Sequence, residues 1–210
     1  MNNLRQYIRQ TLLIEAAKQP EDLEPEHIVV MLDLGETVTF SLMFRTKKGS
    51  QFQTGRIAIT QDARRNGPCL NAWEVISAEA RDGYGPLLYD LAMEHAGRDG
   101  LMADRRSVSR AAMRVWDFYL NSRPGVRPKQ LDVARPIRFK GTITPDDESD
   151  DCRQDKYFNH HYAEGDNWEK AWSGTEEDIE DYLASPMTKA YVKTGTPVTD
   201  KLRELGKLEE

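Results

Sequence analysis

The sequence predicts an α/β (α+β) fold built on a mixed β-sheet, followed by an acidic C-terminal part. Residues 27–34 are mostly β-branched or apolar, and Thr37–Thr46 alternates between polar and apolar side chains with the two-residue period of half-buried strands. From Leu87 the apolar residues recur at helical spacing instead. A run of strands followed by helix, strand and helix predicts one sheet with helices packed against it.

The first element is a helix over residues 3–18. Leu4, Ile8, Leu12 and Ala16 recur every four residues, which places them on one helix face. Pro20 then disfavours a helical conformation for the residue before it, so the helix ends there.

Four strands follow, and their connections are short. Lys47–Ser50 has the composition of a hairpin turn, and residues 62–68 separate the third strand from the fourth. Short connections join neighbouring antiparallel strands, so the four form a meander. The expected strands are His27–Leu34, Thr37–Thr46, Phe52–Thr60 and Leu70–Ala78.

Two helices flank a fifth strand. The first helix runs to Ala96, and Gly97 can adopt the left-handed conformation that ends it. Leu101–Ala103 is a short buried strand, expected parallel to the fourth. Ser107 or Ser109 caps the second helix. The apolar face of this helix comprises Ala112, Val115, Trp116 and Tyr119.

The composition changes near residue 140, which predicts a first domain over residues 1–140 and an acidic, partly helical extension over residues 141–210. The extension has 18 acidic and 8 basic residues, a net charge of −10. Pro145–Asp151 is expected to be a solvated loop. Apolar residues predict a small helical segment beyond it and another helix over Val198–Leu208. The segment is anchored by Trp168, Trp172, Ile179, Tyr182 and Leu183.

The mean hydropathy of −0.70 indicates a soluble protein with no membrane partner. No apolar run has the length of a membrane span, and the first residues do not resemble a signal peptide. We therefore expect a cytoplasmic protein. Cys69 and Cys152 are far apart in sequence and form no disulfide framework, so we expect reduced thiols.

Arg98–Lys140 is a basic stretch, with 11 basic and 4 acidic residues. It has three interpretations: a site for the phosphate of a cofactor, a nucleic-acid contact, or a solvated helix face. Arg106, Arg110 and Arg114 lie four apart and would form a stripe on one helix face.

The turn Arg81–Pro86 joins the fourth strand to the first of these two helices. The first amides of a helix have no partner within the helix, and the helix dipole adds partial positive charge there, so anions bind well. Gly83 and Gly85 let a diphosphate approach the backbone, and Pro86 suits the first turn of a helix. The turn therefore predicts phosphate binding.

The order of elements around this turn resembles the GNAT acyltransferase superfamily. The tract Ala80–Tyr119 is also similar to acetyltransferase-like proteins of tailed bacteriophages. The glycine turn Gly83–Asp90 and the later residues Asp104–Arg105 and Val115–Asp117 carry this second resemblance.

The resemblance implies an acyl-CoA-dependent N-acyltransferase, which transfers an acetyl group from acetyl-CoA to an amine of a protein or small molecule. A backbone N–H of the splayed fourth strand would polarise the thioester carbonyl. Glu74 would be the base, with Glu79 as second choice, and Tyr119 would be the acid. The cofactor-binding residues implied are Arg81, Gly83, Tyr84, Gly85 and Leu87.

Other interpretations of these residues remain open. Glu74 can be an exposed strand carboxylate, and Tyr119 can be a packed core residue. Ala80 stands where the superfamily has Arg or Gln, and Trp116 stands where it has Tyr. The chain can therefore be a non-catalytic virion-associated or host-interaction protein on the same fold. A nucleobase-modifying enzyme is the third alternative.

No metal site is predicted from the sequence. Asp150, Asp151 and Cys152 precede His160 and His161, but their spacing matches no zinc signature. Hard carboxylates with one soft thiolate also suit no single metal well.

Overall fold

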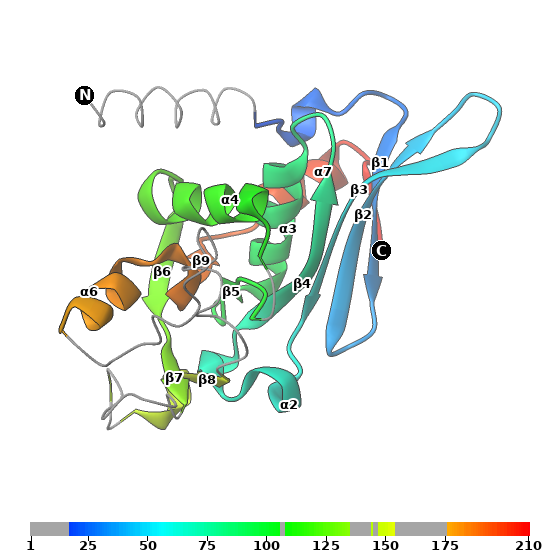
Figure 1. Cartoon of the computed structure of the whole chain (residues 1–210). Helices are drawn as coiled ribbons and strands as arrows, with labels where there is room; N and C mark the ends of the chain where they lie inside the picture. Colours follow the sequence, from blue (N-terminus) through cyan, green and yellow to red (C-terminus); the bar gives the residue numbers. More distant parts are fainter. Residues whose placement is uncertain (1–16, 106–107, 135–143, 145–146, 154–175) are drawn as a thin grey trace, which may run out of the picture.

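The computed structural model describes residues 17–105, 108–134, 144, 147–153 and 176–210. It is a mixed α/β structure around a curled eight-stranded sheet (Figure 1). The strands lie in the order β10-β1-β2-β3-β4-β5-β9-β6. They are β1 (His27–Asp33), β2 (Thr37–Arg45), β3 (Gln51–Thr60), β4 (Trp73–Ala80), β5 (Leu101–Met102), β6 (Val126–Gln130), β9 (Lys189–Lys193) and β10 (Leu208–Glu209).

The expected meander and the two helices that flank the fifth strand are confirmed. From β1 to β4, each strand pairs antiparallel with the next strand along the chain, and β5 pairs parallel with β4. In β2 the residues Val38, Phe40 and Leu42 are buried, while their neighbours are partly exposed, as the two-residue period predicts. The fourth strand begins at Trp73 because the preceding residues form a left-handed turn.

The main helices are α3 (Gly85–Ala96), which Gly97 ends with a φ of 55°, and α4 (Arg110–Asn121). The Ser109 side chain caps α4 by accepting a hydrogen bond from the Ala112 amide at 3.2 Å. Nine of the twelve residues of α3 are buried, because the helix packs on β2–β5, β9 and α7. The shorter helices are α2 (Ala63–Asn66), α6 (Glu176–Ala184), α7 (Pro197–Glu204) and the single turns η1 (Pro20–Asp22), η2 (Cys69–Asn71), η3 (Glu148–Asp150) and η4 (Pro186–Thr188).

Two strands of the main sheet come from the expected C-terminal extension over residues 141–210. Strand β9 lies between β5 and β6 and is antiparallel to both, and β10 pairs with β1. Ala190 and Tyr191 are fully buried. The short apolar run of β9 thus completes the core, although residues 141–210 as a whole carry a net charge of −10. The expected helix over residues 3–18 lies almost wholly outside the described residues, as do Trp168 and Trp172.

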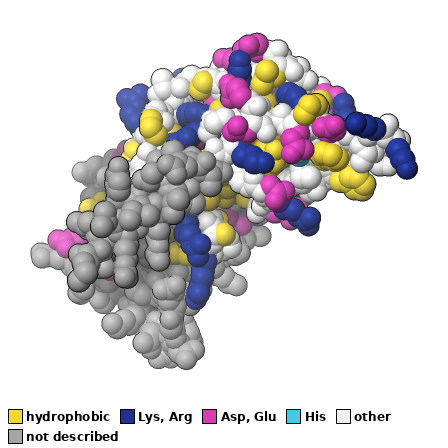
Figure 2. All heavy atoms as spheres, turned by 90° about the horizontal axis from the view of Figure 1, so that it is seen from above, with side chains coloured by type: hydrophobic (Ala, Val, Ile, Leu, Met, Phe, Trp, Pro, Cys, Tyr) yellow, Lys and Arg dark blue, Asp and Glu magenta, His cyan; other side chains and the backbone are white. Residues whose placement is uncertain are grey.

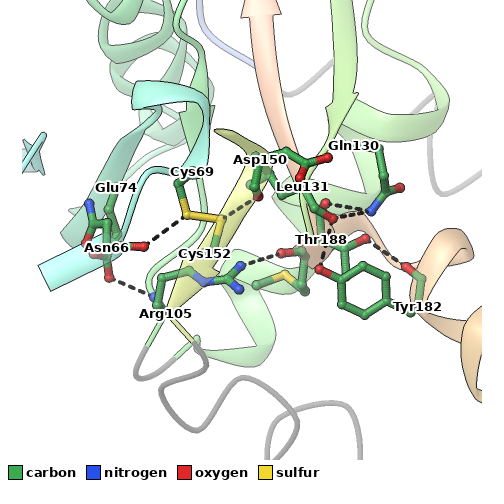
Figure 3. The surroundings of a disulfide bond; sticks show 11 residues. Asn66, Cys69, Glu74, Arg105, Gln130, Leu131, Asp150, Cys152, Tyr182 and Thr188 are labelled. Carbon is green, nitrogen blue, oxygen red and sulfur yellow. Dashed lines mark hydrogen bonds between the residues drawn. A yellow bond between two sulfur atoms is a disulfide. The ribbon is translucent and has the colours of Figure 1, made fainter. Parts of the chain in front are cut away.

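Cys69 and Cys152 form a disulfide, so the expectation of reduced thiols is wrong (Figure 3). The bond joins η2 to β8 (Asp151–Arg153), which pairs in parallel with β7 (Asp132–Ala134) in a second, two-stranded sheet. The partners are 83 residues apart in sequence, and only the fold brings them together. Cys69, Leu70 and Asn71 have φ values of 43°, 52° and 59°, a left-handed conformation that is costly for residues with a Cβ.

Residues 147–153 are not the solvated loop expected of this acidic segment. They form η3 and β8, and Asp150 and Cys152 are buried. Pairing with β7 and the bond to Cys69 bury these residues. Both contacts come from parts of the chain that are distant in sequence, so the local acidic composition did not predict them.

Candidate functional site

A groove opens where β4 separates from β5. The two strands pair only at Trp73 and Glu74, so the rest of β4 has no strand beside it on that edge within the described part of the chain. A β-bulge lies at this point, because Ile76 has no partner in the register with β3. Bulges of this kind bend a strand and redirect its groups.

The backbone of β4 presents amide groups to this groove. The Arg81 amide donates to Thr54 O of the β3 segment at 3.2 Å. Backbone groups alternate between the two edges of a strand, so the N–H groups of Ala78 and Ala80 point away from β3, toward the open edge. This edge offers hydrogen-bond donors to a bound ligand.

The groove has two adjoining sections with volumes of about 320 and 270 Å³. Both sections are lined by Ala78, Tyr89, Ser109 and Ala112. The larger section lies beside the start of α3 and is also lined by Arg56, Glu79, Ala80, Gly85, Leu88 and Ala111. The smaller section reaches Val75, Ile76, Ser77, Asp104, Val108 and Trp116. Together they form one groove between β4, α3 and α4, which we call the β4 groove.

The turn before α3 leaves space at the mouth of the β4 groove. Asp82 and Gly83 have φ values of 56° and 82°, and the Tyr84 amide donates to Arg81 O at 3.1 Å. A Cβ built on Gly85 would meet only the Cβ of Ala80, at 4.0 Å. The first turn of α3 is therefore accessible from the larger section of the groove.

The residues implied for cofactor binding separate into two groups. Arg81 and Gly83 are exposed, and Gly85 lines the groove. Tyr84 and Leu87 are 2% exposed and belong to the hydrophobic core. The Lys18 ammonium lies 4.3 Å from the centre of the Tyr84 ring. The two core residues hold the turn in place and do not line the groove.

Glu74, the implied base, lies beneath the groove in a buried ion pair. Its two oxygens accept hydrogen bonds from Arg65 Nε and Nη2 at 2.8 and 3.0 Å. The Arg105 amide donates to the same carboxylate at 2.8 Å. Arg65 Nη2 also lies 3.7 Å from Asp104, whose side chain does line the groove. Glu74 therefore contacts the site through Arg65 and Asp104.

Tyr119, the implied acid, is 1% exposed and lies outside the groove lining. Its hydroxyl donates to Asp90 at 3.0 Å. Burial, with the charge of Asp90 as the next cause, raises the pKa of Tyr119 well above its ordinary value. These contacts match the alternative interpretation of Tyr119 as a packed core residue.

Tyr89 is the groove residue that the sequence did not single out. It lines both sections, and burial together with the charge of Asp104 raises its pKa to about 12. Its hydroxyl therefore keeps its proton at neutral pH. Tyr89 lies four residues after Gly85, so the two share one face of α3. This spacing was the sequence signal that could have identified Tyr89 as a groove residue.

The basic stretch does not form one surface. Arg105 is 1% exposed, and Arg123 pairs with Asp90. Arg110 and Arg114 are exposed on α4, while Arg106 lies outside the described residues. On the face drawn in Figure 2, positive and negative side chains are interspersed.

No protein-family model, curated protein or solved structure matches this chain. Among the described residues, no helix has both the length and the apolar character needed to cross a bilayer.

Proposed function

We propose that this chain is an acyl-CoA-dependent N-acyltransferase with a GNAT-like fold, which transfers an acetyl group to an amine of a protein or small molecule. The observation that carries the proposal is the β4 groove: a bulged strand edge with outward amides, adjoining a glycine turn at the start of a buried helix. The position of β4, beside a parallel β5 and antiparallel β3, supports the resemblance of the sequence to that superfamily.

The larger section of the groove fits the diphosphate and the arm of acetyl-CoA. The start of α3 provides amides and the positive end of the helix dipole, and Gly85 leaves room for the diphosphate. The N–H groups of Ala78 and Ala80 lie along the path of an extended arm. Arg81 is exposed beside the same turn, where its charge favours a phosphate.

The smaller section fits the acceptor amine. An acyl-CoA thioester supplies an activated acyl group, to whose carbonyl carbon the amine forms a C–N bond as the C–S bond breaks. Asp104 is the carboxylate that lines this section, and it accepts the proton of the amine, directly or through water. Tyr89 donates a proton to the sulfur that leaves. Glu74 is then a positioning residue that holds Arg65 against Asp104.

Calorimetry of the full chain with acetyl-CoA, desulfo-CoA and ADP tests the binding step. Gly85→Trp should abolish binding, because the new ring fills the mouth of the groove. Gly85→Ala should retain it, since the Cβ has 4.0 Å of clearance. Gln51→Trp, at an exposed position of β3, is the control. Absence of binding at millimolar CoA overturns the proposal and favours the non-catalytic interaction protein.

Turnover tests the chemical step. Tyr89→Phe should keep the affinity for acetyl-CoA but lower the release of free CoA in the presence of a panel of primary amines, by about 10²-fold for a general acid. Tyr119→Phe is the matched control, because that hydroxyl lies outside the groove. Equal losses in the two variants would assign the effect to packing. Nucleoside mass spectrometry after expression tests the nucleobase-modifying alternative.

We also propose that the chain is encoded by a tailed bacteriophage and acts in the host cytoplasm, with the virion as the alternative location. Disulfides are rare in a reducing cytoplasm. Trapping of thiols in freshly lysed host cells distinguishes the two, because cytoplasmic protein should show two free thiols and virion protein none.

A further inference from the structure

Three aspartates meet beside the disulfide, at the two-stranded sheet. Asp132 begins β7, Asp150 ends η3 and Asp151 begins β8. One carboxylate oxygen from each lies within 4.8 Å of the other two. We call these three residues the β7–β8 cluster. Figure 3 shows Asp150 next to Cys152, on the far side of the disulfide from Asn66.

Two oxygens of the β7–β8 cluster are buried and have no hydrogen-bond partner among the described residues. They are Oδ1 of Asp150 and Oδ1 of Asp151. Asp150 is only 5% exposed, so water cannot easily compensate. Its Oδ2 accepts from the Thr144 hydroxyl at 2.8 Å, which orients the carboxylate and leaves Oδ1 directed elsewhere.

The charges of the cluster repel one another. Burial raises the pKa of both Asp150 and Asp151, and the neighbouring carboxylates, Asp132 among them, raise it further. No lysine or arginine in the described part of the chain forms an ion pair with either residue. A buried group of like charges is stabilised by a positive partner, and a bound cation can be that partner.

The disulfide makes the donor set uniform. Bonded to Cys69, Cys152 has no thiolate to offer, so only carboxylate and hydroxyl oxygens remain. Such oxygens prefer hard cations. Two ligands on opposite sides of Ca²⁺ are about 4.6–5.2 Å apart, and around the smaller Mg²⁺ about 4.0–4.2 Å. The span of the cluster is compatible with both ions, and ligands on a short sheet and a turn suit the flexible geometry of Ca²⁺.

We propose that Asp132, Asp150 and Asp151 bind one divalent cation of the Ca²⁺ class, with Thr144 orienting the carboxylates. The bound ion neutralises the cluster and holds β7 against η3 and β8. It lies at the part of the chain that the disulfide also fixes, so it stabilises this sheet. The proposal does not depend on the acyltransferase assignment.

Calorimetric titration of the EDTA-treated, oxidised full chain with CaCl₂ tests the proposal. We expect one saturable site with a Kd of about 10⁻⁵ to 10⁻³ M, the range of moderate carboxylate sites. Asp150→Asn should weaken it by about tenfold or more, since it removes a ligand charge. Glu148→Gln removes an exposed charge from the same segment and should leave the Kd within about twofold, because the residue offers no ligand.

A second measurement guards against misfolding of the variant. Ca²⁺ should raise the Tm of the wild-type chain and of Glu148→Gln, but not that of a folded Asp150→Asn, as judged by circular dichroism. Absence of saturable binding by the wild type at about 10 mM CaCl₂ overturns the proposal. Equal Ca²⁺ affinities of Asp150→Asn and Glu148→Gln also overturn it, because Ca²⁺ would then respond only to the net negative charge of the segment.

Discussion

Two buried acidic clusters in this molecule are neutralised in different ways. Asp90 and Glu94 of α3 face Arg123 and Lys193, and Lys193 Nζ lies 3.1 Å from Asp90 and 2.7 Å from Glu94. Glu94 also accepts hydrogen bonds from the first amides of α7. The β7–β8 cluster has Thr144 and its own members as neighbours, but Asp150 and Asp151 have no basic partner among the described residues.

The way in which a buried carboxylate is neutralised distinguishes a structural role from a ligand-binding role. In the α3 cluster, each carboxylate joins elements that are distant in sequence, and the chain supplies the opposite charge. In the β7–β8 cluster, the covalent bond between Cys69 and Cys152 supplies the connection, and no described lysine or arginine pairs with Asp150 or Asp151. A buried carboxylate without a cation from its own chain is therefore the better indicator of a ligand.

Removing one partner of the α3 cluster should have the largest effect. Glu94→Gln leaves Lys193 and the α7 amides with a neutral, weaker acceptor, so we expect a loss of about 3 kcal/mol in the free energy of unfolding. Urea denaturation measures it. Glu204→Gln breaks an exposed i,i+3 pair with Lys201 and serves as the control, with an expected change below about 0.5 kcal/mol. Similar losses in Glu94→Gln and Glu204→Gln would show that burial of the charge does not determine the loss of stability.

Loss of the disulfide should have the second-largest effect on the free energy of unfolding. Replacing both cysteines by serine, or reducing them, frees a loop whose ends are 83 residues apart. Disulfides typically contribute about 2–4 kcal/mol, so we expect a loss of that size. Urea denaturation with and without reductant checks this value. The reduced chain should also bind Ca²⁺ more weakly, because η3 and β8 lose their covalent link to η2. An unchanged denaturation midpoint on reduction would mean that β7–β8 is held by other contacts.

The contrast between local and distant contacts also explains how far the sequence could predict this molecule. The meander, α3, Gly97 and the Ser109 cap follow from periodicity and end signals within a few residues. Strand β9 could not be predicted in the main sheet, because its apolar run is only three residues long and its partners are β5 and β6, which are distant in sequence. The disulfide is a contact of the same distant kind.

The candidate site shows the same limit. The turn Arg81–Pro86 has a local signature, and Gly85 does line the groove. The roles of Glu74 and Tyr89 depend on what lies across from them. Arg65 comes from the connection between the third and fourth strands, and its pairing with Glu74 could not be predicted from the sequence. Helical spacing places Tyr89 on the same face of α3 as Gly85, but Tyr89 lines the groove only because α4, which is distant in sequence, packs opposite it.

Acid should stabilise the β7–β8 cluster when no cation is bound, because the pKa of Asp150 is raised in the folded chain. The folded pKa of Asp150 is raised, so in EDTA the carboxylate contributes most stability below its unfolded value of 3.8 and loses it as pH rises through the folded pKa. Relative to Asp150→Asn, the wild type should gain stability as pH falls from 7 toward 3.8. Urea denaturation of both proteins over this range measures the difference. Saturating Ca²⁺ should reverse the order of the two proteins at pH 7, and an unchanged order would contradict a bound ion.

The smallest effect is expected at an ion pair of good geometry on the surface. Arg45 Nη2 lies 2.7 and 2.6 Å from the two oxygens of Glu209, and it links β2 to the C-terminal strand β10. The two side chains are 40% and 48% exposed, whereas that of Glu94 is fully buried. Water already solvates the exposed charges, so Glu209→Gln should cost about 0.2–1 kcal/mol, and about 1 M NaCl should remove most of that difference. The loss in Glu94→Gln should persist in the same salt, because buried charges are screened much less. If salt diminished both losses equally, burial would not be what distinguishes the α3 cluster, and the inference that the β7–β8 cluster needs an external cation would lose its basis.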